Sequence, residues 1–408
     1  MARSLYICYF GVREPLVQTQ VIPYLREIIK DGHRMSLLTF EPSTLTKDEQ
    51  GQIRGDLRQQ GIEWHHLKYH KRFSAIATAW DIFQGARFIR KFISRKKPDI
   101  LHGRVHVPTL MAAIARKFSR HKPKILFDIR GFMPEEYTDA GIWPENGSLY
   151  RGAKRVERWL LKEADGFVVL TERAREILFP ESAESGYDKN GRPVEVIPCC
   201  VDLSRFASAN EDTRREIRRQ LAIGDRYVMA YVGAFGGWYL TEQTADLFGA
   251  LKKLRPDAYA MILTQSKPEM IEPLIKTRGY GQGDYLITKV PPSQIANYLK
   301  AADSAVSFIK NCYSKQASSP TKNAEYLASG LPVIANAGIG DTDLHIRGGR
   351  VGTLVDGFSS EDLANAVGEI LAMTDTDERC RRFAKGYFDL VNVGGNRYRR
   401  IYQQLLQS

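Results

Sequence analysis

A lysine stands where the start of a helix ordinarily has an acidic or neutral side chain. In SSPTKNAEYLASGLPVIAN, residues 318–336, Ser319 is placed to cap a helix and Pro320 to occupy its first position. Lys322 then falls in the first turn, where a capping box has Glu or Gln and a cation costs about 0.3–1 kcal/mol against the helix dipole. A bound diphosphate would turn this misfit into an attraction. The alternative is a lysine that points into water.

Two further features of the second half suit a nucleotide diphosphate. Glu325, one turn after Lys322, could accept hydrogen bonds from the hydroxyls of a ribose. In YVGAFGGWYLTE, Gly233, Gly236 and Gly237 allow backbone N–H groups to converge on an anion ahead of a helix. The segment lacks the Lys-Ser/Thr pair of a P-loop, so the motif alone does not establish phosphate binding.

The loops of the first half carry side chains suited to an acceptor with hydroxyl groups. Carboxylates among aromatic and glycine residues can accept hydrogen bonds from a sugar, and one could act as a base. The alternatives are an ordinary turn, a buried structural histidine and a structural Asp–Arg pair. A nicotinamide cofactor is disfavoured because the first loop is not G-x-G-x-x-G. The residues are Gly11 in YFGVREPLVQTQ, His102 and Arg104 in LHGRVHVP, and Asp128, Arg130, Glu135 and Glu136 in FDIRGFMPEEYTDAGIWPENG.

Short apolar runs alternate with amphipathic stretches along the chain. This alternation predicts an α/β protein of two doubly wound parallel sheets, in which ligands bind beyond the carboxyl ends of the strands. We place the domains at residues 1–200 and 201–385, followed by a terminal helix at 386–408 that packs on its own domain or returns to the first. The predicted strands are Ser4–Phe10, Arg34–Phe40, Asp99–Gly103, Lys124–Gly131, Gly166–Thr171, Val194–Pro198, Tyr227–Ala234, Ala258–Thr264, Asp284–Val290, Ser304–Ile309 and Leu331–Asn336, and predicted helices include Val17–Lys30, Trp80–Lys97 and Ser293–Ala302.

The composition is that of a globular protein. The chain has 408 residues, of which 43% are hydrophobic and 26% charged, and no apolar run approaches the ~18 residues of a membrane span. The five cysteines lack C-x-x-C spacing, so zinc and a disulfide framework are not expected. We expect no metal site and a cytoplasmic protein, with peripheral contact at the inner face of the membrane as an option.

The net charge of +12 is compatible with phosphorylated ligands, an anionic membrane surface or nucleic acid. In RFIRKFISRKKPD, the residues Phe88, Ile89, Phe92 and Ile93 form one apolar helical face with most cations outside it. This face either packs in the core or contacts a membrane surface. Nucleic acid is not an expected partner, because we see no groove pattern of aromatic residues interleaved with cations.

Five segments resemble the retaining glycosyltransferases of the GT-B fold, in the large bacterial family 4 group. They are GVREPLVQTQVIPYLREIIKDGH, VIPCCVD, VGAFGGWY, VPPSQIANYLKAADSAVSF and SSPTKNAEYLASGLPVIAN, in the family's order. The resemblance implies two Rossmann-like domains facing across a cleft, the first for the acceptor and the second for a nucleotide-diphosphate sugar. It also implies a final helix that returns to the first domain, and sugar transfer with retention at the anomeric carbon without an obligatory metal or a cofactor.

By position, the resemblance also implies residue roles. Glu325 matches the glutamate that binds the nucleotide ribose, whereas the motif's other glutamate, which touches the donor sugar, is replaced by Ala317. The family's phosphate-binding Arg and Lys are missing, and Lys322 is the candidate replacement. Asp128 aligns with the active-site histidine and joins Lys322 and Glu325 as a catalytic candidate. The donor-binding candidates are Gly233, Ala234, Phe235, Gly236, Gly237, Pro291, Ser319, Pro320, Thr321, Lys322 and Glu325, and the acceptor-binding candidates are Gly11, His102, Arg104, Arg130, Glu135 and Glu136.

The expected reaction is transfer of a sugar to a hydroxyl of a glycan or lipid-linked glycan, in surface polysaccharide synthesis. Two alternatives remain open. A nucleotide-sugar epimerase shares the two-domain design and reacts without an acceptor. A non-catalytic nucleotide-sugar-binding module is conceivable because Ala317 replaces a glutamate of the motif. The sugar, the base and the acceptor are not defined by the residues.

Overall fold

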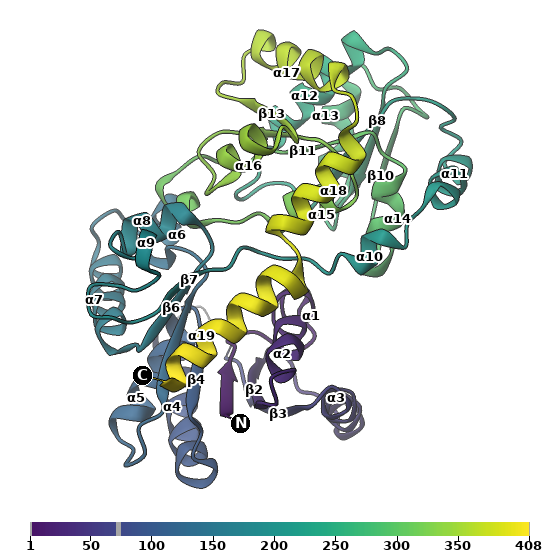
Figure 1. Cartoon of the computed structure of the whole chain (residues 1–408). Coiled ribbons are helices and arrows are strands. Elements are labelled where there is room, and N and C mark those ends of the chain that lie inside the picture. The colour runs from purple at the N-terminus through teal and green to yellow at the C-terminus, as the bar shows by residue number, and fades with distance from the viewer. Residues whose placement is uncertain (1, 71–74, 408) are drawn as a thin grey trace. The chain divides into compact units, whose positions relative to one another are not determined.

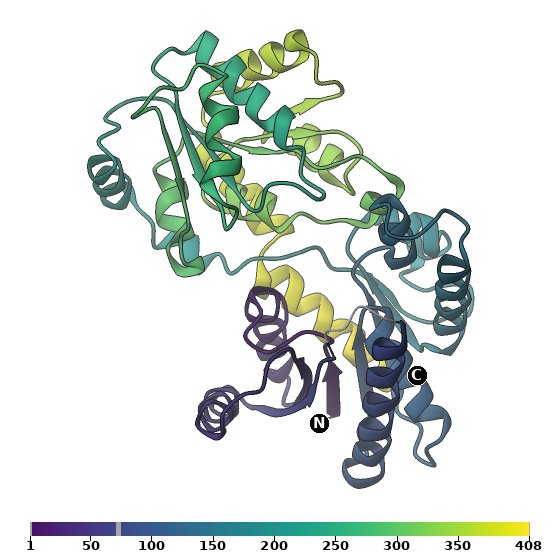
Figure 2. The ribbon, with the colours of Figure 1, turned by 180° about the vertical axis from the view of Figure 1, so that it is seen from behind.

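The computed structural model describes residues 2–70 and 75–407 and divides into two units. Unit 1 comprises Met1–Pro198 and Leu390–Ser408, and unit 2 comprises Cys199–Asp389. The sequence placed these boundaries after residues 200 and 385. Each unit is a parallel sheet with helices on both of its faces (Figures 1 and 2). The predicted α/β class with two doubly wound domains is therefore confirmed.

The sheet of unit 1 has seven parallel strands in the order β3-β2-β1-β4-β5-β6-β7. Strand order reverses at β1, which pairs with both β2 and β4. The loops after β1 and β4 therefore diverge at the carboxyl edge, which is where ligands bind in such sheets. The strands are β1 (Arg3–Ile7), β2 (Arg34–Glu41), β3 (Ile62–Lys68), β4 (Ile100–Arg104), β5 (Lys124–Ile129), β6 (Gly166–Val169) and β7 (Val194–Val196).

The helix predicted over Val17–Lys30 is two helices. The break falls at Val21, whose φ of −126° and ψ of −68° are not helical. Pro23 lies in the first turn of the second helix and has no N–H to donate to the carbonyl of Thr19, so one continuous helix would lose a hydrogen bond there.

The helices of unit 1 are α1 (Pro15–Gln20), α2 (Ile22–Ile29), α3 (Lys47–Gln59), α4 (Ala75–Lys96), α5 (His106–Lys117), α6 (Met133–Asp139), α7 (Ser148–Glu163), α8 (Glu172–Leu178), α9 (Ser182–Ser185), η4 (Leu390–Gly395) and α19 (Asn396–Gln407).

The apolar face of α4 packs within the protein. Ile89, Phe92 and Ile93 are buried, whereas Arg90 and Lys91 are exposed. The first of the two interpretations of this helix, a core-packing helix with a solvated basic face, therefore holds for these residues. None of the helices in the described ranges combines the length and the apolar character needed to cross a bilayer.

The sheet of unit 2 has six parallel strands in the order β10-β9-β8-β11-β12-β13. Both faces of β8 are buried, since Val228 and Ala230 join one apolar cluster and Met229 joins the other. This explains the uninterrupted apolar run of β8. The strands are β8 (Val228–Val232), β9 (Tyr259–Leu263), β10 (Tyr285–Thr288), β11 (Ser304–Ser307), β12 (Val333–Asn336) and β13 (Gly352–Val355). The helices are α10 (Ser204–Ala207), α11 (Glu211–Gln220), α12 (Thr241–Leu254), η1 (Pro268–Met270), α13 (Glu272–Lys276), η2 (Pro292–Gln294), α14 (Ile295–Lys300), η3 (Tyr313–Ala317), α15 (Thr321–Ala328), α16 (Thr342–Gly349), α17 (Ser360–Ala372) and α18 (Thr376–Tyr387).

The last helix, α19, belongs to unit 1, while the preceding α18 belongs to unit 2. It lies beside α2 and β7 (Figure 1). Arg400 forms a bidentate ion pair with Glu195 in β7, with N–O distances of 2.7 and 2.8 Å. Arg399 donates to the carbonyl of Glu27 in α2 at 3.2 Å. The chain therefore leaves unit 1 after β7 and returns to it through this helix.

Candidate active site

The helix start that carries Lys322 differs by one residue from the prediction. Pro320 is itself the N-cap, in an extended conformation with φ −66° and ψ 113°, and α15 begins at Thr321. Ser319, which the sequence placed as the N-cap, instead accepts a hydrogen bond from the N–H of Cys199 at 3.1 Å. Among the described residues, no side chain caps the helix start. The N–H of Asn323 donates to the carbonyl of Pro320 at 3.1 Å. The other first-turn N–H groups of α15 lack the side-chain oxygen that a capping residue supplies in most helices.

Lys322 is buried among aromatic rings. Its Nζ atom lies 3.9 Å from the ring centre of Tyr239 and 4.4 Å from that of Tyr231. The side chain has no hydrogen-bond partner among the described residues, and the residue is 7% exposed. The alternative of a lysine that points into water is therefore wrong. Cation–π contacts hold the ammonium group but leave its three N–H donors unused.

Burial lowers the pKa of Lys322 to about 7, with the carboxylate of Glu325 acting in the opposite direction. Glu325 lies one helical turn further on and is half-buried. Burial raises its pKa to about 7 as well, against the opposing charges of Arg205 and Lys322. Two groups in one turn of helix thus have displaced protonation equilibria, which is common at functional sites.

The glycine loop after β8 is shaped around Lys322. Gly233 has a φ of +137°, and a Cβ atom there would lie 3.0 Å from the Nζ of Lys322. Ala234, Gly236 and Gly237 are exposed, and Phe235 is half-buried against the ring of Tyr231. Glycine at position 233 is therefore required both by its backbone conformation and by the neighbouring lysine.

The prediction that N–H groups of this loop converge on an anion needs correction. Three of them already have partners inside unit 2: the N–H of Gly233 donates to the carbonyl of Leu263, that of Phe235 to the hydroxyl of Ser266 and that of Gly236 to the hydroxyl of Thr241. A motif of glycines shows that the backbone can turn, but it does not show where the N–H groups point. The positive charge beside this loop belongs to lysine side chains.

A second buried lysine beside this loop was not predicted. The Nζ of Lys315, in η3, lies 3.8 Å from the ring centre of Trp238. The residue is 6% exposed. The aromatic residues of GGWY, followed by a lysine-containing loop after β11, were the available signal. Ala317, at the end of η3, is buried and has no side chain able to contact a sugar.

Arg205 was also missed, and it links Glu325 to the predicted Pro291. Its guanidinium donates to the carbonyl of Pro292 at 2.7 Å, next to the exposed Pro291, and its charge acts on Glu325. Arg205 lies in α10, at the start of unit 2. Within this unit the structure therefore brings together α10, the loop before α14, the glycine loop and the start of α15.

In unit 1 the predicted residues at the ends of β4 and β5 form a buried charge cluster around Asp128. The hydroxyl of Tyr398 donates to Asp128 Oδ2 at 3.0 Å. His102 Nε2 lies 3.5 Å, Arg104 3.8 Å and Arg130 3.6 Å from a carboxylate oxygen of Asp128. Burial opposes the charge of Asp128, but the surrounding cations, Arg130 foremost, outweigh it and lower its pKa to about 2.

His102 is hydrogen-bonded through one ring nitrogen only, since its Nε2 lies 3.5 Å from Asp128 and has no hydrogen-bond partner among the described residues. Its Nδ1 is 2.9 Å from the hydroxyl of Tyr402 in α19, and burial lowers its pKa although Asp128 opposes the shift. Arg104 donates to the carbonyl of Gln20 and to the hydroxyl of Tyr6. This geometry corresponds to two of the alternatives named from the sequence, a structural Asp–Arg pair and a buried structural histidine. A contact of these residues with an acceptor stays a prediction.

The remaining acceptor-site candidates also have partners within unit 1. A Cβ atom on Gly11 would lie 2.7 Å from the ring of Pro42, so packing alone requires glycine there. Glu135 is buried and bonded to Lys154 at 2.9 Å and Tyr150 at 3.1 Å. Glu136 is half-buried and lies against Gly131, where a Cβ atom would be 3.1 Å from its Oε1. In the part of the chain that the structure describes, no three His, Cys, Asp or Glu side chains are grouped to hold a metal ion.

Comparisons with known proteins show which family the chain matches. Residues 17–205 match the Glycosyltransferase Family 4 domain, and residues 213–387 match the Glycosyl transferases group 1 domain. The fold is similar to a glycosyltransferase from Rickettsia africae, with a TM-score of 0.72 and 17% identity over 100% of this chain and 99% of the other. Anabaena HepE, solved in complex with UDP and glucose, gives a TM-score of 0.69 at 16% identity, with both chains covered to 100%.

The protein is therefore a glycosyltransferase of the GT-B fold. It belongs to the group whose two halves are the family 4 and group 1 domains, which confirms the resemblance in the sequence. Among curated proteins it is similar to D-inositol 3-phosphate glycosyltransferase from Corynebacterium urealyticum, at 25% identity over 55% of this chain and 52% of the relative. The chain thus spans about half the length of the curated relatives it matches.

Proposed function

We propose that the protein transfers a sugar, with retention of anomeric configuration and without a metal ion, from a nucleotide-diphosphate sugar to a hydroxyl acceptor. The observation that carries this proposal is Lys322, a buried ammonium group that has no hydrogen-bond partner among the described residues and lies at the uncapped start of α15. Leaving a charged group buried and unpaired is unfavourable, and a diphosphate at the helix start would satisfy the lysine and the remaining first-turn N–H groups together.

The ammonium group of Lys322 also accounts for catalysis in this proposal. Cleavage of a sugar–phosphate bond develops negative charge on the departing diphosphate. A donor already aimed at that charge stabilises the transition state, and loss of a comparable donor costs roughly 2.7–4 kcal/mol. Lys315, on the ring of Trp238, adds a second cation beside the same loop. The donor side of the reaction therefore lies within unit 2, on the lysines and the start of α15.

Glu325 binds the nucleotide ribose in this proposal. As a carboxylate it accepts hydrogen bonds from the ribose hydroxyls, with Arg205 and the loop of Pro291 beside it. UDP is the first nucleotide to test, because HepE was solved with UDP and glucose. The acceptor is a glycan or lipid-linked glycan of a surface polysaccharide, and the net charge of +12 suits a site at an anionic inner membrane surface.

The test is calorimetric titration of the full chain with UDP. Wild type and Lys253→Ala, which removes an exposed lysine of the same unit, should bind equally, and Lys322→Ala should bind at least about tenfold more weakly. Equal binding by all three proteins would remove Lys322 from the donor site. Proton NMR of the product made from a nucleotide sugar then tests retention, through the coupling constant of the anomeric proton.

The same proteins and nucleotide sugar distinguish this function from two others. An epimerase isomerises the donor sugar in the absence of an acceptor, so incubation with donor alone would produce a second sugar. A binding module binds UDP through Lys322 but leaves the donor unchanged with every acceptor offered. Ala317 at the position of the family's sugar-contacting glutamate is the residue that favours this second possibility.

A further inference from the structure

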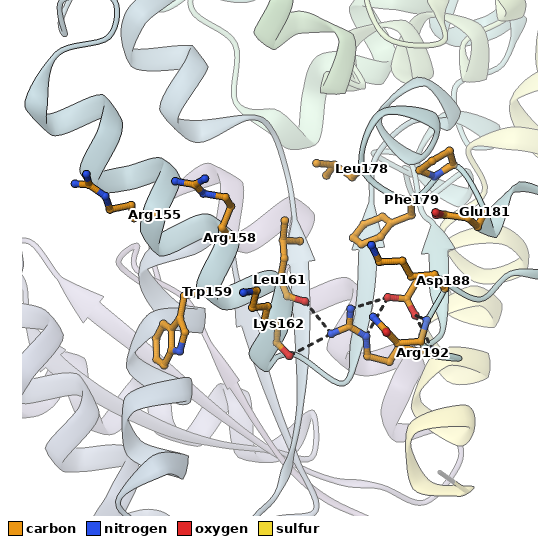
Figure 3. Close-up of a pocket in the computed structure, with 13 residues that line it drawn as sticks. Arg155, Arg158, Trp159, Leu161, Lys162, Leu178, Phe179, Glu181, Asp188 and Arg192 are labelled. Carbon is orange, nitrogen blue, oxygen red and sulfur yellow. Dashed lines mark hydrogen bonds and ion pairs between the residues drawn. The ribbon is translucent and has the colours of Figure 1, made fainter.

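Unit 1 contains a surface cavity of about 860 Å³ that the proposed reaction does not use. It is lined by the second half of α7, the end of α8 and the segment before β7 (Figure 3). These segments adjoin the edge at which β6 and β7 begin. The acceptor-site candidates His102, Arg104 and Asp128 lie instead at the edge where β4 and β5 end. The cavity is therefore separate from the catalytic edge of this sheet.

The cavity is lined by cations that lack carboxylate partners. Arg155, Arg158, Lys162 and Lys189 are exposed and, among the described residues, none of them has an ion pair. Arg158 has one weak internal bond, from its Nε to the carbonyl of Lys154 at 3.3 Å. Positive charges gathered at a concave surface repel each other and raise the local concentration of anions.

Arg192, the fifth cation of the lining, is held in place by bonds within unit 1 and is not a free donor. It is paired with Asp188 at 2.6 Å and donates to the carbonyls of Leu161 and Lys162 at 2.8 and 3.3 Å (Figure 3). It also donates to the carbonyl of Ala164 at 2.9 Å. Its guanidinium also lies over the ring of Phe167. Arg192 thereby ties the segment before β7 to the end of α7, and it neutralises Asp188. Glu181 is the other acid of the lining.

We propose that this cavity binds a phosphate-bearing ligand at a site distinct from the donor site. Arginine and lysine donors around a hollow are suited to phosphate oxygens, and Trp159 supplies an apolar wall for the group that the phosphate carries. The phosphate comes either from a soluble phosphate ester or from the headgroup of an anionic phospholipid. Both sources present the same oxygen atoms to the same side chains.

The test uses inorganic pyrophosphate on the full chain with Lys322→Ala, which weakens binding at the proposed donor site. Arg158→Gln with Lys162→Gln, added to this background, should weaken pyrophosphate binding by at least about tenfold. Arg90→Gln with Lys91→Gln removes the same charge from the exposed face of α4 and should leave the affinity unchanged. All four positions are exposed, so these variants should fold normally, which circular dichroism checks.

Co-sedimentation with phosphatidylcholine vesicles, with and without phosphatidylglycerol, separates the two sources. Loss of phosphatidylglycerol-dependent binding in the cavity pair, with retention in the α4 pair, supports a lipid headgroup. Selective loss of pyrophosphate binding without a selective effect on vesicles supports a soluble phosphate ester. Equal behaviour of the two pairs in both assays, or no binding in either, overturns the proposal.

Discussion

Asp128 in unit 1 and Lys322 in unit 2 are both buried charged side chains near the carboxyl edge of a parallel sheet, but their surroundings differ. Asp128 accepts a hydrogen bond from Tyr398 and is approached by His102, Arg104 and Arg130. Lys322 has two aromatic rings and the carboxylate of Glu325.

The two environments have opposite effects on whether the buried side chain keeps its charge. The neighbours of Asp128 outweigh its burial, so its pKa falls to about 2 and the charge is kept. For Lys322 burial dominates, so its pKa falls to about 7 and the charge is half lost near neutral pH. A buried charge with partners contributes to the architecture, whereas a buried charge without them is prepared for an external partner. The predictions below test this difference.

The largest effect is expected in unit 1. Asp128→Asn keeps the shape of the side chain but leaves Arg104 and Arg130 buried without their carboxylate. Removal of one partner of a buried ion pair typically costs about 3–5 kcal/mol, so the free energy of unfolding should fall by that amount in a denaturant titration. Asp56→Asn, at an exposed position of α3, should change it by less than about 0.5 kcal/mol.

A different outcome would reverse the assignment of Asp128. If Asp128→Asn lost activity while retaining the wild-type free energy of unfolding, the carboxylate would act on the acceptor or sugar and would not be mainly structural. The comparison between the units would then fail, because both buried charges would serve the reaction.

The second effect concerns turnover. Lys322→Met keeps an unbranched side chain but removes the ammonium group, so turnover of the nucleotide sugar should fall about a hundredfold or more, as for loss of a transition-state donor worth roughly 2.7–4 kcal/mol. The melting temperature should stay equal or rise, because an unpaired buried charge is lost. Lys253→Met, at an exposed site, is the matched control. A large drop in melting temperature would mean that Lys322 is structural, as Asp128 is.

Much of the architecture was accessible from the sequence because the strands that were recognised are continuous apolar runs. Strand β3, IEWHHLK, was missed because it carries two histidines and is partly exposed. Strand β13, GTLV, was missed because it contributes only two apolar residues. Both are edge strands, but so are β7 and β10, which were predicted, so the edge position alone does not hide a strand in the sequence.

Lys322 was recognised because it conflicts with its local environment, as a cation in the first turn of a helix is unfavourable. Asp128, His102, Arg104 and Arg130 were named from their positions at strand ends, and a structural Asp–Arg pair was among the alternatives. The hydrogen bond that Asp128 accepts from Tyr398 was not predicted, because Tyr398 is 270 residues away in the chain. The hydrogen bond from Phe235 to Ser266 was likewise not predicted, because Ser266 lies 31 residues further along the chain. Thr241, which accepts from Gly236, lies within the glycine segment itself and could have been considered. Contacts between distant residues have no local signature.

A third prediction separates the ribose from the diphosphate. Glu325→Gln should weaken UDP binding by about tenfold or more, because a carboxylate accepts stronger hydrogen bonds than an amide. Binding of inorganic pyrophosphate, which has no ribose, should change much less. Glu369→Gln, at an exposed position of α17, should affect neither ligand. An equal loss for UDP and pyrophosphate would show that Glu325 acts through Lys322 and does not contact the ribose.

The smallest effect is also the most direct test of the contrast between the units. Because the pKa of Lys322 is about 7 in the free protein, most of the side chain is neutral at pH 8. A diphosphate beside Nζ favours the protonated form and raises this pKa, so binding of UDP-glucose takes up protons at any pH between the two values. Calorimetry at pH 8 in buffers of different ionisation enthalpy should give an uptake that approaches one proton for each ligand bound.

At pH 6 the uptake attributed to Lys322 should become small, because the ammonium group is already protonated before binding. Lys322→Met should lose this contribution at pH 8, so the difference between wild type and variant isolates it from any protonation of Glu325, whose pKa is also about 7. Proton uptake that is the same in wild type and Lys322→Met would mean that the diphosphate does not contact this lysine. Its burial among Tyr231 and Tyr239 would then be structural, and the two units would no longer differ in the use of their buried charges.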